Sequence, residues 1–527
     1  MFKVLVSDPL AEAGLEILRR NSEIEVDVKI GLKPEELKSI ISNYEALIVR
    51  SETKVTSEIL ESARELKVIG RAGVGVDNVD VPAATKRGII VMNTPDGNTI
   101  SAAEHAMALL LSLARNVPQA NASLRGGQWD RKRFLGVELY NKTLGLIGLG
   151  RVGREVAKRS QAFGMKVIAY DPFISYERAA ELGVPMLELP ELLKKADFIS
   201  LHAPLTSETR HLLGEKEFAE IKPGVRLVNC ARGGIVDEEA LYRALVEGKV
   251  AGAALDVFEK EPPTGNPLLQ LENVLALPHL GASTQEAQIN VSIVIANQII
   301  DVLKGGPIRN AINIPVIEAE VREQLEPFLL LAEKVGRLQA QIIEGRLKEV
   351  RITYSGDIIN YDLAMVTIAF IKGILEPILQ EGVNYVNASI LAKERGIRII
   401  ESKSSEPADF ANLITVEVIS DKERRLVAGS SFGHKTPKIV RIDEFYMDVT
   451  PSGYMLICTN QDVPGVVGTV GTILGRNQIN IAGLQLGRSQ PGGKAVSVFN
   501  IDNPIPKNVL QELHQVVEIL SAKLVML

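Results

Sequence analysis

Three residues whose side chains could take part in a reaction follow apolar runs in the middle of this sequence. His279 stands in LALPHLGAST, Arg232 in NCARGGIVDE and Glu261 in LDVFEKEPP. A histidine with its ordinary pKa of about 6.5 is suited to accept a proton from a hydroxyl group. A carboxylate beside it orients the ring and favours its protonated form, and a guanidinium holds a carboxylate in a bidentate fork. Together they would suit the oxidation of a secondary alcohol that carries a carboxylate.

Each of the three also has a plain structural interpretation. Arg232 could be a surface arginine in a glycine-rich turn, Glu261 one charge in a solvated EKE run, and His279 a loop histidine. Their order along the chain, each at the end of a successive apolar run, favours the functional interpretation.

The elements that must position these residues form an α/β pattern over roughly the first 310 residues. Short apolar runs alternate there with amphipathic segments, which is typical of parallel sheets covered on both faces. The first set of strands is predicted at 2–6, 46–49, 67–70 and 89–91, before a helix capped by Ser101. The second set is predicted at 143–147, 166–170, 197–201, 225–230, 250–255 and 273–277, before a helix over 283–304. Arg232, Glu261 and His279 then follow the carboxyl ends of strands, where ligands bind in such sheets.

A dinucleotide-binding motif opens the second set. Gly148, Gly150 and Gly153 form G-x-G-x-x-G between a strand and a helix, a pattern that lets a pyrophosphate approach a helix N-terminus. Asp171 ends the next strand and can accept hydrogen bonds from ribose hydroxyls. No arginine follows it before Arg178, so NAD is favoured over NADP. The alternative for Asp171 is a turn residue before Pro172.

From residue 316 onward, the pattern of apolar and polar residues changes. Residues 316–345 look helical, and 347–448 mix strands and helices without a catalytic-looking cluster. From residue 449 the order is β-α-β-β-α-β, the ferredoxin-like arrangement. Its first helix is opened by DVPG, and Asp462 is most simply that helix's N-cap.

Composition limits the remaining possibilities. With 59 basic and 65 acidic residues, the net charge is −6 and no basic block occurs, so nucleic acid and anionic membranes are not expected partners. The two cysteines, Cys230 and Cys458, make no disulfide framework and fit a reducing cytoplasm. No apolar run reaches the length of a membrane span, no metal site is evident, and the length predicts several domains.

The motifs GLGRVG, ARGGIVDE, ALDVFEKEPP and PHLGAST resemble those of the NAD-dependent D-2-hydroxyacid dehydrogenases, over residues 1 to about 310. The resemblance implies that Arg232, Glu261 and His279 are catalytic. It also implies a doubly wound Rossmann-type sheet and a split, flavodoxin-like substrate lobe. The NAD-binding residues that it implies are Gly148, Gly150, Arg151, Val152, Gly153, Asp171, Ala203, Cys230, Ala231, Asp256, Gly281 and Ala282.

Two further stretches, VRSETKVT and GRAGVGVDNVD, resemble the substrate loops of the branch that oxidises 3-phospho-D-glycerate in serine biosynthesis. Arg50, Ser51 and Asn98 are then expected to meet the carboxylate and phosphate, with backbone amides near Val74 and Gly75. The rival interpretations are a glyoxylate or hydroxypyruvate reductase and an NAD(H)-sensing regulatory protein without catalysis.

The carboxyl-terminal segment TNQDVPGVVGTVGTILGRNQINIAGLQLGR resembles an ACT domain, a module that commonly binds amino acids. The effector residues expected there are Asn460, Asp462, Gly465 and Asn480. Serine-inhibited relatives carry histidine where this chain has Asn460. Two roles of the ACT domain are therefore left open: binding L-serine as an effector, or forming a dimer through its sheet alone.

The predicted division is a substrate lobe at 1–98, an NAD-binding domain at 99–282, a returning helix at 283–310, an α+β intervening domain at 311–448 and an ACT domain at 449–527. A homodimer or homotetramer is expected.

Overall fold

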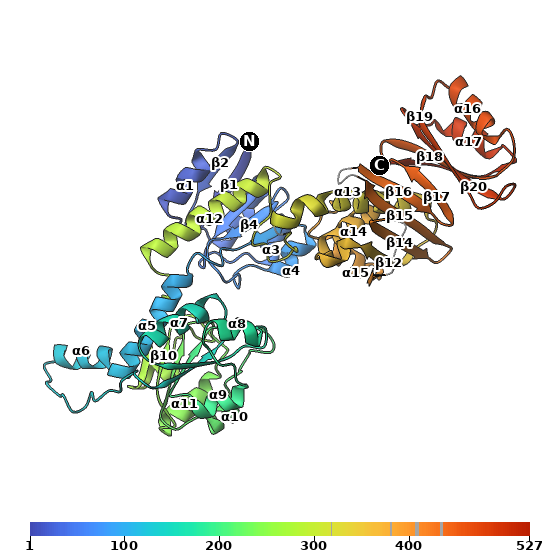
Figure 1. The fold of residues 1–527 in the computed structure, drawn as a ribbon. Coiled ribbons are helices and arrows are strands. Elements are labelled where there is room, and N and C mark those ends of the chain that lie inside the picture. The colour runs from blue at the N-terminus through green and yellow to red at the C-terminus, as the bar shows by residue number, and fades with distance from the viewer. Residues whose placement is uncertain (318, 380–381, 406–409, 433–435) are drawn as a thin grey trace.

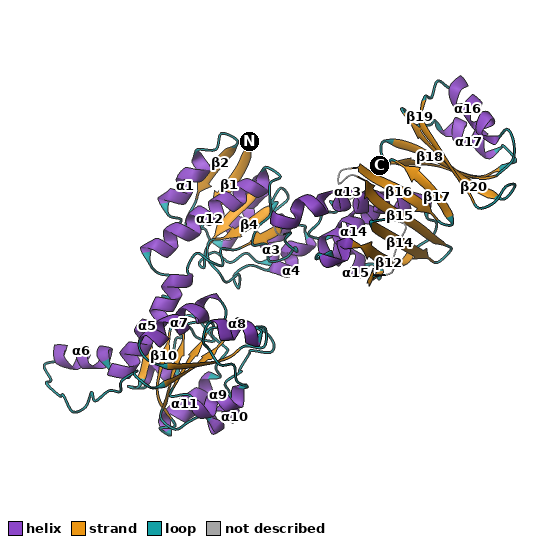
Figure 2. Ribbon diagram, in the orientation of Figure 1, coloured by secondary structure: helices purple, strands orange, loops and turns teal. Residues whose placement is uncertain are grey.

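The computed structural model describes residues 1–317, 319–379, 382–405, 410–432 and 436–527. These described residues form four β-sheets, of which two are parallel, one is mixed and one is antiparallel. Figure 1 shows two α/β lobes connected by helices α5 (Thr99–Arg115) and α12 (Gln285–Leu303), with two further domains beyond the first lobe. Figure 2 shows helices on both faces of the lobe sheets, as the apolar strands predict.

The first lobe holds a five-stranded parallel sheet in the order β2-β1-β3-β4-β5, which is the flavodoxin-like order. Its strands are β1 (Phe2–Val6), β2 (Ile24–Val28), β3 (Ala46–Val49), β4 (Val68–Arg71) and β5 (Ile90–Met92). Its helices are α1 (Glu12–Arg19), α2 (Pro34–Ile40), η1 (Ile41–Asn43), α3 (Ser57–Ser62) and α4 (Val81–Lys86). The sequence pattern did not predict β2, because this edge strand is partly exposed and polar residues interrupt it.

Helix α12 belongs to the core of the first lobe, although it follows the second lobe in sequence. Ile295 and Ile299 are fully buried against the strands. Gly14 of α1 lies so close to Ser292 that a Cβ there would be 2.6 Å from the Ser292 carbonyl oxygen. The lobe is therefore completed only when the chain returns to it, as expected for a split lobe.

The second lobe holds a six-stranded parallel sheet in the order β11-β10-β9-β8-β6-β7. Its strands are β6 (Thr143–Ile147), β7 (Lys166–Tyr170), β8 (Phe198–Leu201), β9 (Val225–Asn229), β10 (Val250–Leu255) and β11 (Val274–Ala276). A parallel bridge between Ala169 and Met186 stands beyond β7, where a Rossmann sheet has its third strand. The helices are α6 (Val117–Arg125), α7 (Arg151–Ala162), α8 (Tyr176–Glu181), α9 (Leu189–Lys195), α10 (Glu215–Glu220), α11 (Glu238–Val246) and η2 (Pro267–Gln270).

The start of α5 differs from the sequence-based expectation. The helix begins at Thr99 with Asn98 at the N-cap, so Ser101 does not cap it. Ser101 is instead buried inside the helix, and its hydroxyl donates to the carbonyl oxygen of Gly281 at 3.0 Å. This contact links the first crossing between the lobes to the loop after β11.

The described residues of the intervening domain pack helices against a six-stranded sheet. Its helices are α13 (Ala319–Ile342), η3 (Asp357–Asn360), α14 (Ala364–Leu379) and α15 (Ala388–Glu394). Its strands are β12 (Leu347–Gly356), β13 (Arg398–Ser404), β14 (Asn412–Ser420), β15 (Arg424–Phe432), β16 (Thr436–Ile442) and β17 (Phe445–Val449). Residue 318, within the predicted helix 316–345, lies outside the described residues, as do three short gaps within 347–448.

The last domain has the predicted β-α-β-β-α-β order and the sheet order β19-β20-β18-β21. Its elements are β18 (Tyr454–Gln461), α16 (Val466–Arg476), β19 (Ile481–Arg488), β20 (Lys494–Ile501), α17 (Lys507–His514) and β21 (Ile519–Met526). One face of this sheet, through Met455, Val498 and Val525, joins the core of the intervening domain. Along the described parts of the chain, we find no helix with the length and apolar character that crossing a membrane requires.

Candidate active site

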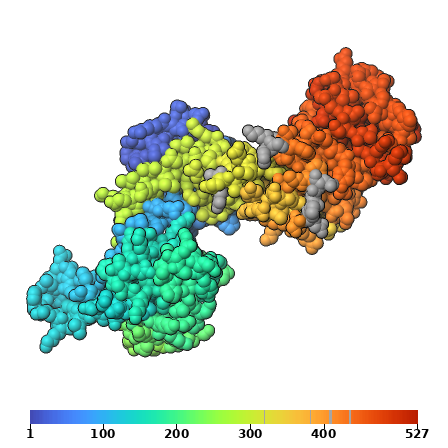
Figure 3. Space-filling view, in the orientation of Figure 1, coloured from blue at the N-terminus to red at the C-terminus, as the bar shows by residue number. Residues whose placement is uncertain are grey.

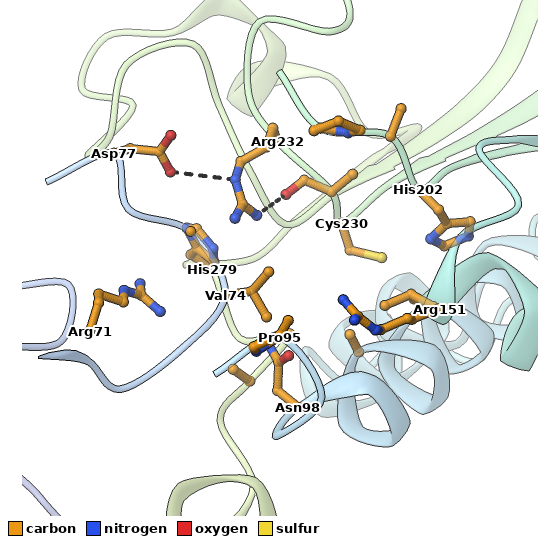
Figure 4. Close-up of a pocket in the computed structure, with 18 residues that line it drawn as sticks. Arg71, Val74, Asp77, Pro95, Asn98, Arg151, His202, Cys230, Arg232 and His279 are labelled. Carbon is orange, nitrogen blue, oxygen red and sulfur yellow. Dashed lines mark hydrogen bonds and ion pairs between the residues drawn. The ribbon is translucent and has the colours of Figure 1, made fainter. Parts of the chain in front are cut away.

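A cavity of about 390 Å³ lies between the first and second lobes. Its lining comes mainly from loops that follow parallel strands: the loop after β4 in one lobe, and the loops after β8, β9 and β11 in the other (Figure 4). The lining residues are Arg71, Val74, Gly75, Asp77, Pro95, Asn98, Ala102, Arg151, Val152, His202, Ala203, Pro204, Cys230, Ala231, Arg232, His279, Gly281 and Ala282. The carboxyl ends of both sheets therefore face one shared space, as predicted.

His279 and Glu261 form a direct pair beside this cavity. The Nδ1 atom of His279 lies 2.9 Å from Oε2 of Glu261, although 18 residues separate them in sequence. The hydrogen bond that the Glu261 carboxylate accepts raises the pKa of His279 above its ordinary value, and burial opposes this only in part. Because Nδ1 is held by the carboxylate, Nε2 is the nitrogen that remains to accept a proton.

Glu261 and Asp256, the two carboxylates near His279, both accept hydrogen bonds from backbone amides. Burial favours a raised pKa for Glu261, but the hydrogen bond and the charge of His279 outweigh it, so the pKa lies below its ordinary value. The other oxygen of Glu261 accepts from the amide of Phe258 at 3.2 Å. Asp256 is buried and accepts from the amides of Leu280 and Gly281 at 2.7 and 2.9 Å, which fixes the loop that carries His279.

Arg232 lies across the cavity from the first lobe. Its Nη1 donates to the carbonyl oxygen of Ala231 at 2.7 Å, and its Nε lies 3.4 Å from Oδ2 of Asp77 in the other lobe. Figure 4 shows Asp77 joined to the guanidinium by a dashed line, with the His279 ring close below it in this view. A Cβ at Gly75 would lie 2.3 Å from Nη2, so the guanidinium packs directly on the Val74–Gly75 backbone.

Arg71 is a site residue that the sequence interpretation missed. It lines the cavity from the end of β4, and burial together with the nearby charges of Arg232 and Arg50 lowers its pKa to about 10. Its Nε is buried without a hydrogen-bond partner among the described residues. The residue stands inside GRAGVGVDNVD, so a search for cationic residues at strand ends would have found it.

Only some of the predicted substrate-binding residues line the cavity. Val74, Gly75 and Asn98 line the cavity. Arg50 and Ser51 follow β3 in the same lobe and do not line it, although the charge of Arg50 acts on Arg71. The cavity thus has arginines on both sides, which suits a substrate with two anionic groups.

The glycine turn after β6 has the geometry that a pyrophosphate requires. Gly148 has a φ of 96°, and a Cβ at Gly153 would lie 2.3 Å from the Gly148 carbonyl oxygen. At Gly150, the N-cap of α7, a Cβ would meet no described atom within 4 Å. The first and third glycines are therefore needed for the turn, whereas the second leaves room beside the helix N-terminus. Asp171 stays close, since its Oδ2 accepts from the Leu149 amide at 2.8 Å.

The remaining predicted NAD residues lie around the same space. Arg151, Val152, Ala203, Cys230, Ala231, Gly281 and Ala282 all line the cavity, and Asp256 lies behind it. Burial raises the pKa of the Cys230 thiol to about 12. His202, which was not predicted, also lines the cavity, and burial lowers its pKa to about 4. Among the described residues no cluster suited to a metal ion occurs.

The four predicted effector residues are not gathered in one place. Asn460 is buried in the ACT sheet, where its Oδ1 accepts from Ser497 at 3.0 Å. Asn480 is exposed and donates to Asp502 at 2.7 Å. The prediction that Asp462 caps α16 is wrong. Gly465, with a φ of 98°, is the N-cap, and the Asp462 carboxylate accepts a hydrogen bond from Arg488 instead.

A cavity of about 610 Å³ lies between α16 and α17 of this domain. Gly465 lines it, whereas Asn460, Asp462 and Asn480 do not. The other lining residues are Gly468, Thr469, Thr472, Ile473, Arg476, Glu512, Gln515 and Val516.

Comparison with known proteins agrees with these features. The chain matches the D-isomer specific 2-hydroxyacid dehydrogenase NAD-binding domain over residues 107–281, the D-3-phosphoglycerate dehydrogenase intervening domain over 324–443, and the ACT domain over 454–518. It is 49% identical to D-3-phosphoglycerate dehydrogenase of Archaeoglobus fulgidus, over 99% of both chains. It is 48% identical to the enzyme of that name from Methanocaldococcus jannaschii, over 98% of both chains.

Among solved structures, the chain is similar to D-lactate dehydrogenase from Aquifex aeolicus complexed with NAD and lactic acid. The two are 32% identical with a TM-score of 0.52, and the match covers 57% of this chain and 96% of that one. The likeness is thus confined to somewhat more than half of the chain.

Proposed function

Because the chain belongs to the D-3-phosphoglycerate dehydrogenases, which oxidise 3-phospho-D-glycerate with NAD, we propose that Arg232, Glu261 and His279 carry out this oxidation. The observation that carries the proposal is the pair of His279 Nδ1 and Glu261 Oε2 at 2.9 Å, beside a cavity that Arg232 also lines. The reaction is the first step of L-serine biosynthesis.

Each residue has one role in this proposal. Arg232 holds the substrate carboxylate and the 2-oxygen, and His279 accepts the hydroxyl proton at Nε2. Glu261 orients the ring through Nδ1 and stabilises the imidazolium that forms. NAD, when bound, accepts the hydride from C2 of the substrate. Closing of the two lobes excludes water from the cavity.

We propose that the NAD site is formed by the residues that the family resemblance indicates. The support is the turn at Gly148, Gly150 and Gly153, with room for a pyrophosphate at Gly150 and with Asp171 beside it. As the sequence predicts, Arg50, Ser51 and Asn98 are proposed to meet the carboxylate and phosphate of the substrate, with the amides near Val74 and Gly75. Because Arg232 is assigned to the carboxylate, we assign Arg50 and Ser51 to the phosphate end; Val74, Gly75 and Asn98 line the cavity itself. Arg71 joins this set, since its unpartnered Nε is buried at the cavity.

We propose the same domain division that the sequence suggests: residues 1–98 and 283–310 as the substrate lobe, 99–282 as the NAD-binding domain, 311–448 as the intervening domain and 449–527 as the ACT domain. L-Serine is the proposed effector of the ACT domain, and a homodimer or homotetramer is the proposed assembly. A cytoplasmic location is proposed as well, and Cys230 and Cys458 are free thiols.

A substrate panel with purified protein and NAD tests substrate and effector together. We expect NADH formation with 3-phospho-D-glycerate, far slower turnover of D-lactate and D-glycerate, and inhibition on addition of L-serine. Faster turnover of D-lactate or D-glycerate than of 3-phospho-D-glycerate would contradict the substrate, and an unchanged rate with L-serine would contradict the effector.

A further inference from the structure

A buried carboxylate lies next to the loop assigned to the substrate phosphate. Asp8 follows β1 and is only 2% exposed. Its Oδ2 accepts from the backbone amide of Arg50 at 2.5 Å, and its Oδ1 accepts from the Thr53 hydroxyl at 2.5 Å. The Thr53 amide donates to both oxygens at 3.1 and 3.2 Å. All four hydrogen bonds therefore serve one short segment, residues 50–53.

A second residue holds the same segment through its carbonyl groups. The Nδ2 atom of Asn78 donates to the carbonyl oxygen of Arg50 at 2.8 Å and to that of Thr53 at 2.6 Å. Asn78 lies in the loop after β4 that also carries Val74, Gly75 and Asp77. Asp8 and Asn78 thus connect the loops after β1, β3 and β4.

Beyond Asp8 and Asn78, the side chains of the segment make few contacts, and the main one joins the Thr53 and Ser7 hydroxyls at 3.0 Å. Ser51 is exposed, and the side chain of Arg50 makes one long contact, from Nη1 to the carbonyl oxygen of Pro9 at 3.4 Å. Hydrogen bonds to a buried carboxylate are about twice as strong as neutral ones, and losing one leaves a buried charge with an unmet acceptor. The backbone position of residues 50–53 therefore depends on Asp8.

We propose that Asp8 is a positioning residue for the phosphate end of the substrate. It acts through the backbone of Arg50 and Thr53, with Asn78 as the second anchor, and it does not touch the substrate. The inference rests on the proposed assignment of Arg50 and Ser51 to the phosphate. Small displacements of binding groups weaken binding strongly, so the effect belongs to phosphate affinity and not to the chemistry at C2.

Two competitive inhibitors separate the ends of the substrate site. Inorganic phosphate probes the segment 50–53, and D-glycerate probes the carboxylate and hydroxyl end near Arg232. Thr53→Val removes the hydroxyl donor to Asp8, together with the contact to the Ser7 hydroxyl, and keeps the side-chain shape. Thr53→Ser restores the hydroxyl, and Asp8→Asn removes the charge while leaving Thr53 and Ser7 unchanged. Asp27→Asn is the matched control, because Asp27 lies on neighbouring β2 and its carboxylate accepts from Tyr44 instead.

We expect Thr53→Val and Asp8→Asn to raise the phosphate inhibition constant and the KM for 3-phospho-D-glycerate about tenfold, the size of losing one charge-assisted hydrogen bond. The D-glycerate inhibition constant and kcat should change by less than about twofold, and Thr53→Ser should restore phosphate affinity. A parallel rise of both inhibition constants, or no rise of either, in a folded variant overturns the inference.

Arg50→Ala distinguishes this inference from the assignment beneath it. If Arg50→Ala leaves phosphate inhibition unchanged, the assignment of the phosphate to Arg50 is wrong. If Arg50→Ala weakens phosphate inhibition and Thr53→Val does not, the assignment stands and only the positioning role of Asp8 fails. Melting temperatures of all variants, measured alongside, show whether Asp8→Asn is folded, and Thr53→Val alone decides the question where it is not.

Discussion

At the scale of single residues, the proton acceptor is prepared by its partner. The hydrogen bond between His279 and Glu261 raises the pKa of the imidazole, whereas the same contact holds the pKa of the carboxyl below its ordinary value. Oxidation needs neutral His279, because a protonated ring cannot accept the hydroxyl proton. The rate of oxidation should therefore fall as the pH drops through the pKa of His279.

Glu261→Gln should move this fall to lower pH. The amide can still meet Nδ1, but it lacks the negative charge that raises the pKa of His279, so the ring stays neutral to a lower pH. We expect kcat/KM at its plateau to drop on the order of tenfold to a hundredfold, since orientation and charge stabilisation are weakened. The pH profile of kcat/KM measures both effects. Glu259→Gln is the control, because Glu259 is a nearby carboxylate paired with His211, and the pH profile should not shift in this variant. An unshifted pH profile in Glu261→Gln would contradict the pairing of Glu261 with His279.

Arg71→Ala should weaken substrate binding more than cofactor binding. Arg71 lies on the substrate side of the cavity, where burial and neighbouring arginines lower its pKa to about 10, and an anion would relieve that repulsion. We expect KM for 3-phospho-D-glycerate to rise roughly tenfold or more, the size of one or two charge-assisted hydrogen bonds. Initial rates at varied substrate and NAD provide the test, with exposed Arg64→Ala as control. Equal increases in both KM values would speak against a substrate role.

At the scale of elements, the turn between β6 and α7 should respond differently at its two glycines. Gly153→Ala places a Cβ 2.3 Å from a carbonyl oxygen, so the turn must shift, whereas at Gly150 the Cβ meets no described atom. We expect Gly153→Ala to lower the free energy of unfolding by about 1–3 kcal/mol. Gly150→Ala should leave the melting temperature unchanged and weaken NAD binding. Thermal melts and NAD titrations measure these effects, and unaltered NAD affinity in Gly150→Ala would contradict the pyrophosphate placement.

The sequence predicts best those elements whose own residues show a clear pattern. Strands β9, β10 and β11 are short segments rich in valine, leucine and alanine, so the residues just beyond their ends, Arg232, Asp256 and His279, could be assigned to one edge. Strand β2 was missed because it is a partly exposed edge strand.

Contacts between distant segments could not be predicted in the same way. Asp462 was expected to cap α16, but the chain turns at Gly465 and the carboxylate reaches Arg488 on β19. Asp8 follows β1 and contacts residues 50–53 after the neighbouring strand β3, and nothing near Asp8 in sequence indicates this contact. The pairing of His279 with Glu261 was inferred from chemistry, and its distance came only from the fold.

At the scale of the whole molecule, one part of the second lobe projects away from the rest. Helix α6 and the loop after it form the extension seen at the left of Figure 1 and, in space-filling form, in Figure 3. We call residues 117–140 the arm. Helix α6 has no buried residue, and Trp129 and Leu135 are 78% and 87% exposed. Such apolar exposure is typical of a surface that a partner covers, so we predict that the arm contributes to the interface of the proposed homo-oligomer.

Trp129→Glu combined with Leu135→Glu should weaken the assembly, because charges at a contact that excludes water are costly. We expect a lower molar mass in light scattering after size exclusion at micromolar concentration, with an unchanged circular dichroism spectrum. Phe173→Glu, at an exposed aromatic residue outside the arm, serves as the control. A double variant with the molar mass of the unaltered protein would remove the arm from the interface.

The central claim, that His279 accepts the substrate proton in the oxidation of 3-phospho-D-glycerate, is tested most directly by NADH formation in His279→Ala at saturating substrate and NAD. We expect the rate to fall by about 10²–10⁴-fold while NAD affinity, measured by fluorescence titration, changes by less than about twofold. A variant that forms NADH at nearly the rate of the unaltered enzyme would contradict the claim.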